Sequence, residues 1–390
     1  MRVLVLTSST GGGHDMRARS LKAWSETQAA APLKLEIELF QALEETHSVY
    51  RWGVSIYNWI QNHWPLLHHV YFNVLELLSL HRDSKVILGK EKFVAKVEAY
   101  RPAVIVSTHA HLNHGFFELA RMVLGKQKVK CVTYCGELHG GYGFSRHWVN
   151  TGADLFIGAV PETCHAATDL GMLEEKTAVG GFLLNPAFYR PRLNSEQRAC
   201  FVTQELGLEP GTFTVVLATG GNSANNHVAL LNALARASLP VQVVALCGRS
   251  ASALADVNNW AMDIGRRVGI RVTGIPFTSR LNELFQVASV VVARPGTGTT
   301  SECIQCTCPI LFNGLGGIMP QEFTTVKCAR QHGFAGVIKT PLDLPRLIRT
   351  MIAPSDVCEA HKNALRQVKP ALHPMDILHL LVGEKVYDRV

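Results

Sequence analysis

Short apolar runs alternate along the chain with longer segments of helical periodicity, and the alternation occurs in two successive blocks. Apolar runs rich in β-branched residues are typical of buried strands. The runs of the first block are 2–7, 35–40, 103–107, 130–133 and 153–157, and those of the second are 214–218, 242–246, 270–273, 290–293 and 310–312. Helices are predicted between them, at 15–30, 161–170, 228–237, 281–288 and after residue 322. Because this alternation is typical of parallel sheets covered by helices, we predict an α/β protein with two doubly wound domains.

A proline-bearing stretch separates the two blocks. Asn185, Pro186 and Pro191 interrupt the pattern there, and such stretches are frequent in linkers between domains. We therefore predict an N-terminal domain at 1–187 and a C-terminal domain at 188–364. The tail at 365–390 is mildly helical and can pack back on the N-terminal domain.

The composition favours packed domains and anionic partners. Of the 390 residues, 47% are hydrophobic and 18% charged, which is enough for sizeable cores and too apolar for a disordered chain. The formal net charge of +7 favours binding of anions. Because the chain has no Arg/Lys-rich arm and no recognisable nucleic-acid-binding motif, we do not expect nucleic acid as a partner.

We see neither an export signal nor a membrane-spanning segment. The chain begins with a short predicted strand that runs directly into a glycine loop. No apolar run approaches the ~18–20 residues of a membrane span. The ten cysteines are therefore expected to be thiols in a reducing cytoplasm.

The strand predicted at 290–293 leads into a glycine-rich turn and then a helix. Such a turn exposes backbone N–H groups beside the positive end of a helix dipole, which suits a diphosphate. Glu302 is expected in the first helical turn, where a carboxylate can accept hydrogen bonds from the paired hydroxyls of a sugar. For this loop taken alone, the alternative is an ordinary turn between a strand and a helix, in which the glycines only avoid steric clashes.

A second glycine loop follows the first predicted strand. Gly11, Gly12 and Gly13 precede His14, which stands at the start of a predicted helix. The helix dipole would lower the pKa of His14 and keep it neutral, as a general base requires. The alternative is a capping or hydrogen-bonded structural histidine.

Two groups of potential metal ligands do not favour a metal. Three cysteines lie on or just after a predicted helix, and we interpret them as buried packing residues: Cys303, Cys306 and Cys308. Three histidines follow the strand at 103–107, where no carboxylate lies nearby: His109, His111 and His114. We predict a polar loop at these histidines and no metal site.

Aromatic residues are concentrated at 50–72. This stretch holds three of the six tryptophans, Trp52, Trp59 and Trp64, with basic or titratable residues between and beyond them. Amphipathic aromatics with cations suit the interface of an anionic membrane. The alternative is a pair of helices whose aromatic face packs into the domain core.

Five motifs, in this order, resemble those of the monogalactosyldiacylglycerol synthases and processive diacylglycerol glucosyltransferases. They are Thr-Gly-Gly-Gly-His at 10–14, Val-Ser-Thr-His at 106–109, Cys-Gly-Arg at 247–249, Arg-Pro-Gly-Thr-Gly-Thr-Thr-Ser-Glu at 294–302 and Pro-Gln-Glu at 320–322. Order and spacing match along almost the whole chain. The chain is also similar, in its expected fold and in the way it would bind the donor, to the bacterial glycosyltransferase that adds N-acetylglucosamine to the lipid-linked cell-wall precursor.

The resemblance implies a glycosyltransferase of family 28 with a GT-B fold, in which two domains face each other across a cleft. It implies an inverting transfer of a hexose from a UDP-sugar to a membrane lipid, with diacylglycerol as the expected acceptor. No metal or other cofactor is implied, because the helix dipole and loop donors would stabilise the leaving diphosphate. The protein is expected to be cytoplasmic and peripheral on the inner face of a membrane, with an anionic membrane surface as a partner.

Carried over by position, the resemblance assigns roles to individual residues. His14 is the expected base, and Glu137 is a second catalytic candidate. The expected donor-binding residues are Gly12, Gly13, Gly220, Arg249, Phe277, Gly296, Thr297, Gly298, Thr299, Thr300, Glu302, Gln321 and Glu322. Among them, 296–300 would hold the diphosphate, Glu302 the ribose hydroxyls and Gln321 with Glu322 the sugar. The expected membrane and acceptor contacts are Trp52, Trp59, Trp64 and His109.

Three departures from the family pattern leave alternatives open. Tyr134 stands where the family often has aspartate, so Glu137 supplies the missing carboxylate or its role is absent. Arg294 replaces the usual lysine, and no glycine separates Pro320 from Gln321. The alternatives are a GT-B enzyme with a soluble acceptor, a UDP-sugar epimerase and a non-catalytic nucleotide-sugar binder. The donor sugar, glucose, galactose or N-acetylglucosamine, is not fixed by the sequence.

Overall fold

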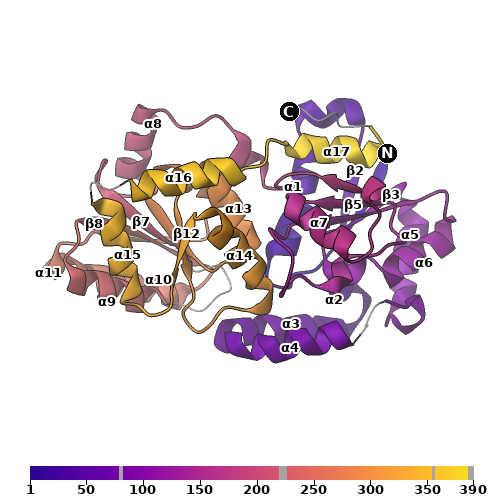
Figure 1. Ribbon diagram of the computed structural model, residues 1–390, viewed down its shortest axis with the longest axis horizontal. Helices are drawn as coiled ribbons and strands as arrows, with labels where there is room; N and C mark the ends of the chain where they lie inside the picture. Colours follow the sequence, from indigo (N-terminus) through magenta and orange to yellow (C-terminus); the bar gives the residue numbers. More distant parts are fainter. Residues whose placement is uncertain (79–81, 219–225, 354–355, 385–390) are drawn as a thin grey trace.

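Two parallel six-stranded sheets organise the computed structural model, one in each lobe of the molecule (Figure 1). The structure describes residues 1–78, 82–218, 226–353 and 356–384. Helices cover both sheets, and the predicted fold class of two doubly wound α/β domains is confirmed.

The N-terminal sheet has the strand order β2-β1-β3-β4-β5-β6, with all neighbours parallel. Its strands are β1 (Arg2–Thr7), β2 (Glu36–Gln41), β3 (Val104–Ser107), β4 (Lys130–Cys135), β5 (Leu155–Gly158) and β6 (Thr177–Val179). The helices of this lobe are α1 (Gly13–Ser25), α2 (Ala42–Thr46), α3 (Ser48–His63), α4 (His68–Leu77), α5 (Lys90–Tyr100), α6 (Gly115–Leu124) and α7 (Pro161–Asp169).

The C-terminal sheet has the order β12-β11-β10-β7-β8-β9, again with all neighbours parallel. Its strands are β7 (Phe213–Ala218), β8 (Val241–Gly248), β9 (Val272–Pro276), β10 (Val290–Ala293), β11 (Ile310–Asn313) and β12 (Ala335–Ile338). The helices that follow the linker are α8 (Ser195–Cys200), α9 (His227–Ala237), α10 (Ala251–Trp260), α11 (Arg266–Val268), α12 (Leu281–Val287), α13 (Thr297–Cys306), α14 (Phe323–His332), α15 (Asp343–Ile352), α16 (Val357–Val368) and α17 (Pro374–Val382).

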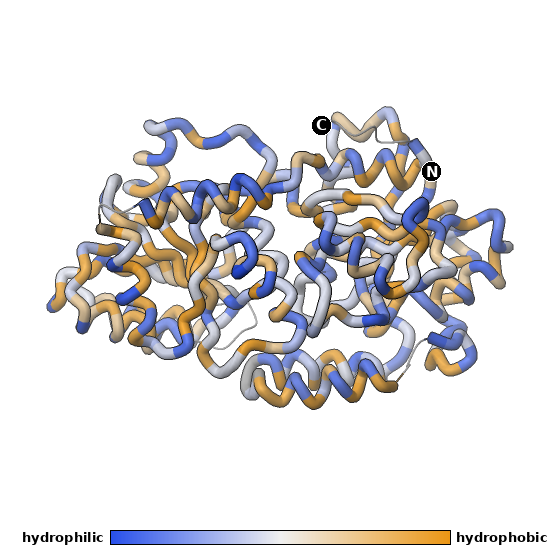
Figure 2. The backbone as a smooth tube through the Cα atoms, in the orientation of Figure 1, coloured by the Kyte–Doolittle hydropathy of each residue, from blue (hydrophilic) through white to orange (hydrophobic). Residues whose placement is uncertain are grey.

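The central strands of both sheets are buried on both faces. Every residue of β10 is buried, and β1 is exposed only at Arg2. Parallel strands covered on both faces read as continuous apolar runs, which is why their positions could be predicted from the sequence. Figure 2 shows such hydrophobic strands inside the C-terminal lobe.

In each sheet the strand order changes direction beside the first strand. The change lies between β1 and β3 in the N-terminal sheet and between β7 and β10 in the C-terminal sheet. Loops that leave the carboxyl ends of strands at such a point diverge and make room for a ligand. His14 follows β1, His109 follows β3 and Thr297 follows β10, so these sequence-selected residues lie beside the two switch points.

Some elements were not predicted, or were predicted with different ends. β6 and β12 are too short to give a clear alternation, and β12 contains Gly336. The helix predicted at 15–30 ends at Ser25, and Gln28–Leu33 forms a 3₁₀ turn that contains a proline. Proline removes a backbone donor and so does not continue an α-helix.

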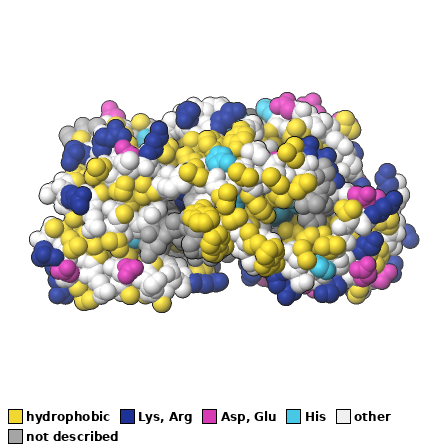
Figure 3. Space-filling view, turned by 90° about the horizontal axis from the view of Figure 1, so that it is seen from below, with side chains coloured by type: hydrophobic (Ala, Val, Ile, Leu, Met, Phe, Trp, Pro, Cys, Tyr) yellow, Lys and Arg dark blue, Asp and Glu magenta, His cyan; other side chains and the backbone are white. Residues whose placement is uncertain are grey.

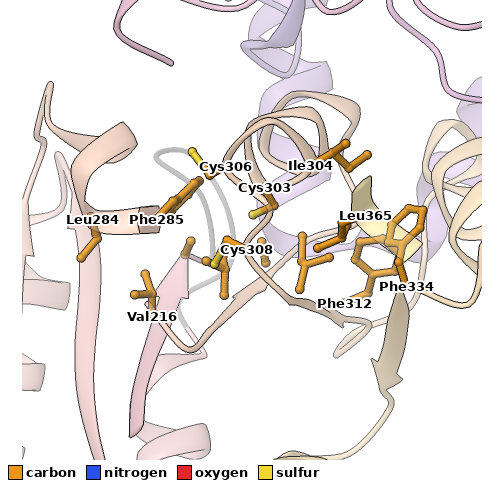
Figure 4. Close-up of a cluster of buried hydrophobic side chains, with 14 of the residues drawn as sticks. Val216, Leu284, Phe285, Cys303, Ile304, Cys306, Cys308, Phe312, Phe334 and Leu365 are labelled. Carbon is orange, nitrogen blue, oxygen red and sulfur yellow. The ribbon is translucent and has the colours of Figure 1, made fainter. Parts of the chain in front are cut away.

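The predicted start of the tail, at residue 365, falls inside α16. Leu365 is fully buried and packs with Phe312 and Phe334 in the C-terminal core (Figure 4). The chain crosses to the N-terminal lobe after α16, and α17 lies there beside α1 (Figure 1). Leu378 of α17 is fully buried in the cluster that contains Val3.

The three neighbouring cysteines lie in a hydrophobic cluster (Figure 4). Cys303, Cys306 and Cys308 are buried there with Phe285 and Ile304, and none of them forms a disulfide. In the described residues, no group of three or more His, Cys, Asp or Glu side chains is arranged to hold a metal ion. Their environment fits the interpretation as packing residues.

We predict that Leu378→Ala destabilises the protein by about 2–5 kcal/mol, because it removes a fully buried side chain and leaves a cavity. Urea unfolding monitored by circular dichroism measures the effect. Leu173→Ala is the control, since half of that side chain is already exposed, and it should change little. Equal midpoints for the two variants would show that α17 is not part of the cooperative unit.

Candidate active site at the domain interface

His14 lies at the first turn of α1. Gly12 precedes the helix with φ at 77°, a left-handed conformation that glycine adopts without strain. The Nδ1 atom of His14 lies 2.7 Å from the backbone oxygen of Thr108, at the end of β3. Because a carbonyl oxygen only accepts, Nδ1 carries the proton and Nε2 is left as the basic nitrogen.

The surroundings of His14 keep it neutral. Burial and, to a smaller extent, the nearby charge of Arg17 lower the pKa of His14 to about 4, although the bond to Thr108 acts in the opposite direction. We expected the helix dipole to be the cause, but burial is the main one. The ring packs against His109, at 4.4 Å between centroids, and against Trp148, at 5.7 Å. None of the described residues hydrogen-bonds Nε2, so this nitrogen is available to a substrate.

His109 lies beside His14 and is almost completely buried. Its Nδ1 accepts a hydrogen bond from the backbone of His111, so its Nε2 carries the proton and donates to the Thr10 hydroxyl at 2.9 Å. His109 therefore supports the first glycine loop and the ring of His14.

The second glycine loop begins α13 on the other side of the interface. Gly296 is the N-cap of this helix and Thr297 its first residue. A Cβ atom on Gly298 would lie 3.3 Å from the Met16 side chain, so the starts of α1 and α13 face each other closely. Thr300 is fully buried, and its hydroxyl has no hydrogen-bond partner in the part of the chain that the structure describes.

Glu302 lies in the second turn of α13, one turn later than we expected, because the helix begins at Thr297. Its side chain is partly exposed, but desolvation raises the pKa of Glu302 to about 8. A carboxyl group with this pKa is largely protonated at neutral pH. Hydrogen-bond donors from a ligand would stabilise its charged form.

Hydrogen bonds of Arg17 and Glu137 join the lobes near His14. The Nη2 atom of Arg17 in α1 donates to the hydroxyl of Thr297 and, at 3.1 Å, to the backbone oxygen of Gly136. The carboxylate of Glu137 accepts a hydrogen bond of 2.8 Å from the hydroxyl of Thr324 in α14. Glu137 is buried, and burial raises its pKa although Arg17 acts in the opposite direction.

Arg249 and Phe277 lie together at the ends of β8 and β9. The guanidinium of Arg249 lies over the Phe277 ring, 5.3 Å from its centroid, and the ring is 68% exposed. An exposed aromatic ring beside a cation suits a nucleotide base. Gly220, another predicted donor contact, lies outside the described residues.

The loop that carries Gln321 and Glu322 is held from two sides. Glu322 is buried and forms an ion pair with Arg294, with 3.0 Å between Nε and Oε1, and it also accepts the Met319 N–H at 2.8 Å. Gln321 donates to the hydroxyl of Tyr57 in α3 at 3.0 Å. Gln321 therefore reaches the interface, while both carboxylate oxygens of Glu322 accept hydrogen bonds from its own domain.

The aromatic helices α3 and α4 present an apolar surface. Trp52, Trp59 and Trp64 are 69%, 49% and 60% exposed, whereas Tyr57 and His68 pack together on the inner side. Exposed apolar side chains extend this surface along α4: Leu66, Leu67, Val70, Val74, Leu77 and Leu78. Figure 3 shows hydrophobic side chains gathered on this underside of the molecule, where α3 and α4 lie.

This surface also contacts the loop of Gln321. Leu66 packs against the backbone of Gly317, where a Cβ atom would come within 2.5 Å of it. A ring nitrogen of His69 in α4 lies 2.9 Å from the backbone oxygen of Ile318. Among the described helices, none is long and apolar enough to cross a bilayer.

Tyr134, at the position of the family's aspartate, belongs to the core. Its hydroxyl donates to the backbone oxygen of Gly181 at 2.8 Å and accepts the N–H of Leu183 at 3.0 Å. Burial raises the pKa of Tyr134 to about 12. Tyr134 therefore ties β4 to the segment before the linker, and does not reach the interface as an acid or base.

The sequence analysis did not select Arg17, Tyr57 and Thr324, which take part in contacts between the lobes. Of these three residues, only Arg17 could have been selected from the sequence. It stands four residues after Gly13 on a helix, so both lie on the same face.

Comparison with known proteins shows what the chain is similar to. Residues 214–312 match the model of the glycosyltransferase family 28 C-terminal domain. The monogalactosyldiacylglycerol synthase of Spinacia oleracea is 24% identical over an alignment that covers 100% of this chain and 74% of that protein.

Solved structures share the fold. The MurG structure from Acinetobacter baumannii superposes with a TM-score of 0.61 at 13% identity, covering 98% of this chain and 99% of that one. Alr3699/HepE of Anabaena, solved in complex with UDP, gives a TM-score of 0.57 at 15% identity, covering 98% and 99%. The chain is a GT-B glycosyltransferase with a family 28 C-terminal domain, distantly related along its whole length to the monogalactosyldiacylglycerol synthases.

Proposed function

We propose that this protein transfers a hexose, with inversion, from a UDP-sugar to the free hydroxyl of a membrane lipid, with diacylglycerol as the acceptor. One observation carries the proposal: a neutral histidine whose Nε2 is free stands directly across the interface from the anion-binding start of α13. A base and a leaving-group site on opposite sides are what a single displacement at a sugar carbon needs. The relatives support the substrates, since they are named for the synthesis of monogalactosyldiacylglycerol.

His14 acts as the general base in this proposal. Its Nε2 takes the proton of the acceptor hydroxyl while the hydroxyl oxygen attacks C1 of the hexose. The bond between C1 and the β-phosphate oxygen breaks, and its electron pair leaves with UDP. The backbone oxygen of Thr108 holds the imidazole in the tautomer that accepts this proton, and His109 packs against the ring.

The donor is held by the C-terminal domain. The first turn of α13, from Gly296 to Thr300, offers backbone N–H groups and the unpartnered Thr300 hydroxyl to the diphosphate. Glu302 accepts the ribose hydroxyls, and Arg249 with Phe277 flanks the base. Gly12 and Gly13 let the opposite backbone come close. HepE, which shares this fold, was solved in complex with UDP, in agreement with the uridine nucleotide that we propose for this protein.

The roles proposed for the two buried carboxylates follow from their contacts. Glu322 fixes the loop from 315 to 322 through Arg294 rather than binding the sugar itself, because both its oxygens are already engaged. Gln321 is the residue of this loop that can contact the donor sugar. Glu137 joins the domains through Thr324, close to the reaction centre, and it takes no proton in the mechanism.

The acceptor enters from the membrane in this proposal. Trp52, Trp59 and Trp64 insert at the level of the lipid headgroups, so the protein binds peripherally to the cytoplasmic face of an anionic membrane. Tyr57 of α3 contacts Gln321, which lies in the loop proposed to bind the donor sugar. A lipid that reaches His14 along α3 therefore meets the sugar at the interface between the domains.

We expect His14→Ala to lower the rate of sugar transfer by about 10²–10⁴-fold, the usual contribution of a general base. Transfer of labelled glucose or galactose from UDP to diacylglycerol in liposomes measures this rate. His165→Ala, at an exposed position on α7, is the matched control and should retain full activity. In the wild-type protein, kcat/KM should hold down to about pH 5 and fall only near pH 4, where His14 becomes protonated. Unchanged turnover in His14→Ala would make His14 a structural residue.

We expect a variant with Trp52→Ala, Trp59→Ala and Trp64→Ala to bind anionic liposomes at least about tenfold more weakly, since it loses most of its insertable apolar area. Sedimentation with phosphatidylglycerol vesicles measures the partition. A matched variant removes three exposed apolar side chains elsewhere, Met122, Leu170 and Leu173. If the wild-type protein itself stays in the supernatant, a soluble acceptor is favoured instead.

We predict that Arg294→Met destabilises the protein by about 3–5 kcal/mol, because Glu322 is left as an unpaired buried carboxylate. Urea unfolding measures the change. Arg267→Met breaks an exposed ion pair with Asp263 and should cost less than about 1 kcal/mol. Similar values for the two variants would mean that Glu322 does not depend on Arg294.

A further inference from the structure

Arg17 occupies the point where three strand-end loops meet. It lies one turn into α1 and is only 4% exposed. Its guanidinium packs so tightly on the segment after β4 that a Cβ atom on Gly136 would lie 2.1 Å from Nε. Its Nη1 lies 3.7 Å from the Cβ position of Gly13, and its Nη2 bonds Thr297. The guanidinium therefore lies between the two glycine loops.

Arg17 forms no ion pair with a carboxylate of the described residues, although its charge acts on the buried carboxyl group of Glu137 and lowers the pKa of that group. The two hydrogen bonds of Arg17 go to neutral acceptors, the Gly136 carbonyl and the Thr297 hydroxyl. Within the described ranges, the Nη1 and Nε atoms of Arg17 have no acceptor. Burying an unpaired charge is costly, and a guanidinium has five donors to satisfy. A buried cation with free donors is arranged for an anion.

Among the described residues of the C-terminal domain, the two arginines at neighbouring strand ends, Arg294 and Arg249, already contact other groups. Arg294, at the base of the glycine loop that begins α13, is engaged by Glu322 and by two backbone oxygens, of Leu315 at 3.1 Å and Gly317 at 2.8 Å. Arg249 is directed over the Phe277 ring. Meanwhile the Thr300 hydroxyl in the first turn of α13 is buried without a partner. The start of α13 therefore offers donors for an anion, and the guanidinium that contacts it comes from the opposite domain.

We propose that Arg17 binds the diphosphate of the donor from the N-terminal domain, so that both domains hold the leaving group. This inference rests on the proposed function. As the bond from C1 to the β-phosphate oxygen breaks, the negative charge that develops on this oxygen is stabilised by the guanidinium through charge-assisted hydrogen bonds. The same positive charge also helps to keep His14 unprotonated. Arg17 would thus serve the base and the leaving group together.

Calorimetric titration with UDP and with uridine tests the proposal, because uridine has no phosphate. We expect Arg17→Gln to weaken UDP binding by about 10- to 100-fold, the size of a charge-assisted contact, and to leave uridine binding within about twofold. Glutamine keeps a donor for Gly136 and Thr297. Arg17→Lys keeps the positive charge but loses the fork geometry, so it should weaken UDP binding by less, about 3- to 10-fold.

A pH profile separates this role from a merely structural one. In Arg17→Gln the acid limb of kcat/KM should move upward from about pH 4, because one of the two causes that lower the pKa of His14 is removed. Arg17→Lys should keep the limb near its wild-type position.

Three results would contradict the proposed role of Arg17 or the proposed function. Equal losses of UDP and uridine binding, or no loss of either, would overturn the role of Arg17. If Arg17→Gln does not fold, Arg17→Lys decides, and wild-type affinity for UDP in that variant would overturn it. A wild-type protein that binds neither UDP nor uridine would instead overturn the proposed function itself.

Discussion

Parallel strand pairing is the constraint on which the site depends. In each domain it brings the carboxyl ends of all strands to one edge, and the change of strand order opens that edge beside β1 and β10. The two edges face each other, so that α1 begins opposite α13. The two glycine loops are linked across the interface, because Arg17 of the N-terminal domain donates a hydrogen bond to Thr297 of the C-terminal domain. The chemistry thus belongs to the interface between the domains.

The fold was readable from the sequence because buried parallel strands are continuous apolar runs. The run at 290–293 and the glycines after it predicted β10 and a helix after it, although α13 begins at Thr297, earlier than expected. His14 could be selected because a glycine loop, a strand end and a titratable side chain coincide at one place in the chain. Local sequence does not reveal what buries a side chain. For this reason the cause of the low pKa of His14 was assigned to the helix dipole, whereas burial and Arg17 are the causes in the structure.

Contacts across the interface could not be predicted, since they join residues hundreds of positions apart. Glu322 illustrates the limit. Its place in a motif suggested a sugar contact, but the fold gives it Arg294 as a partner inside the domain. Tyr134 is a similar case, because its hydroxyl satisfies two backbone groups of the core. In both cases, the hydrogen-bond partners decide the role, and only the folded structure supplies them.

A crystal structure of the protein with UDP tests the central claim most directly, because it locates the leaving group. We expect the diphosphate at the first turn of α13, within hydrogen-bond distance of Arg17, with the ribose at Glu302 and Nε2 of His14 facing the β-phosphate side. UDP bound elsewhere, for example in the cavity of about 630 Å³ lined by Arg192, Arg198 and Lys362, would contradict it.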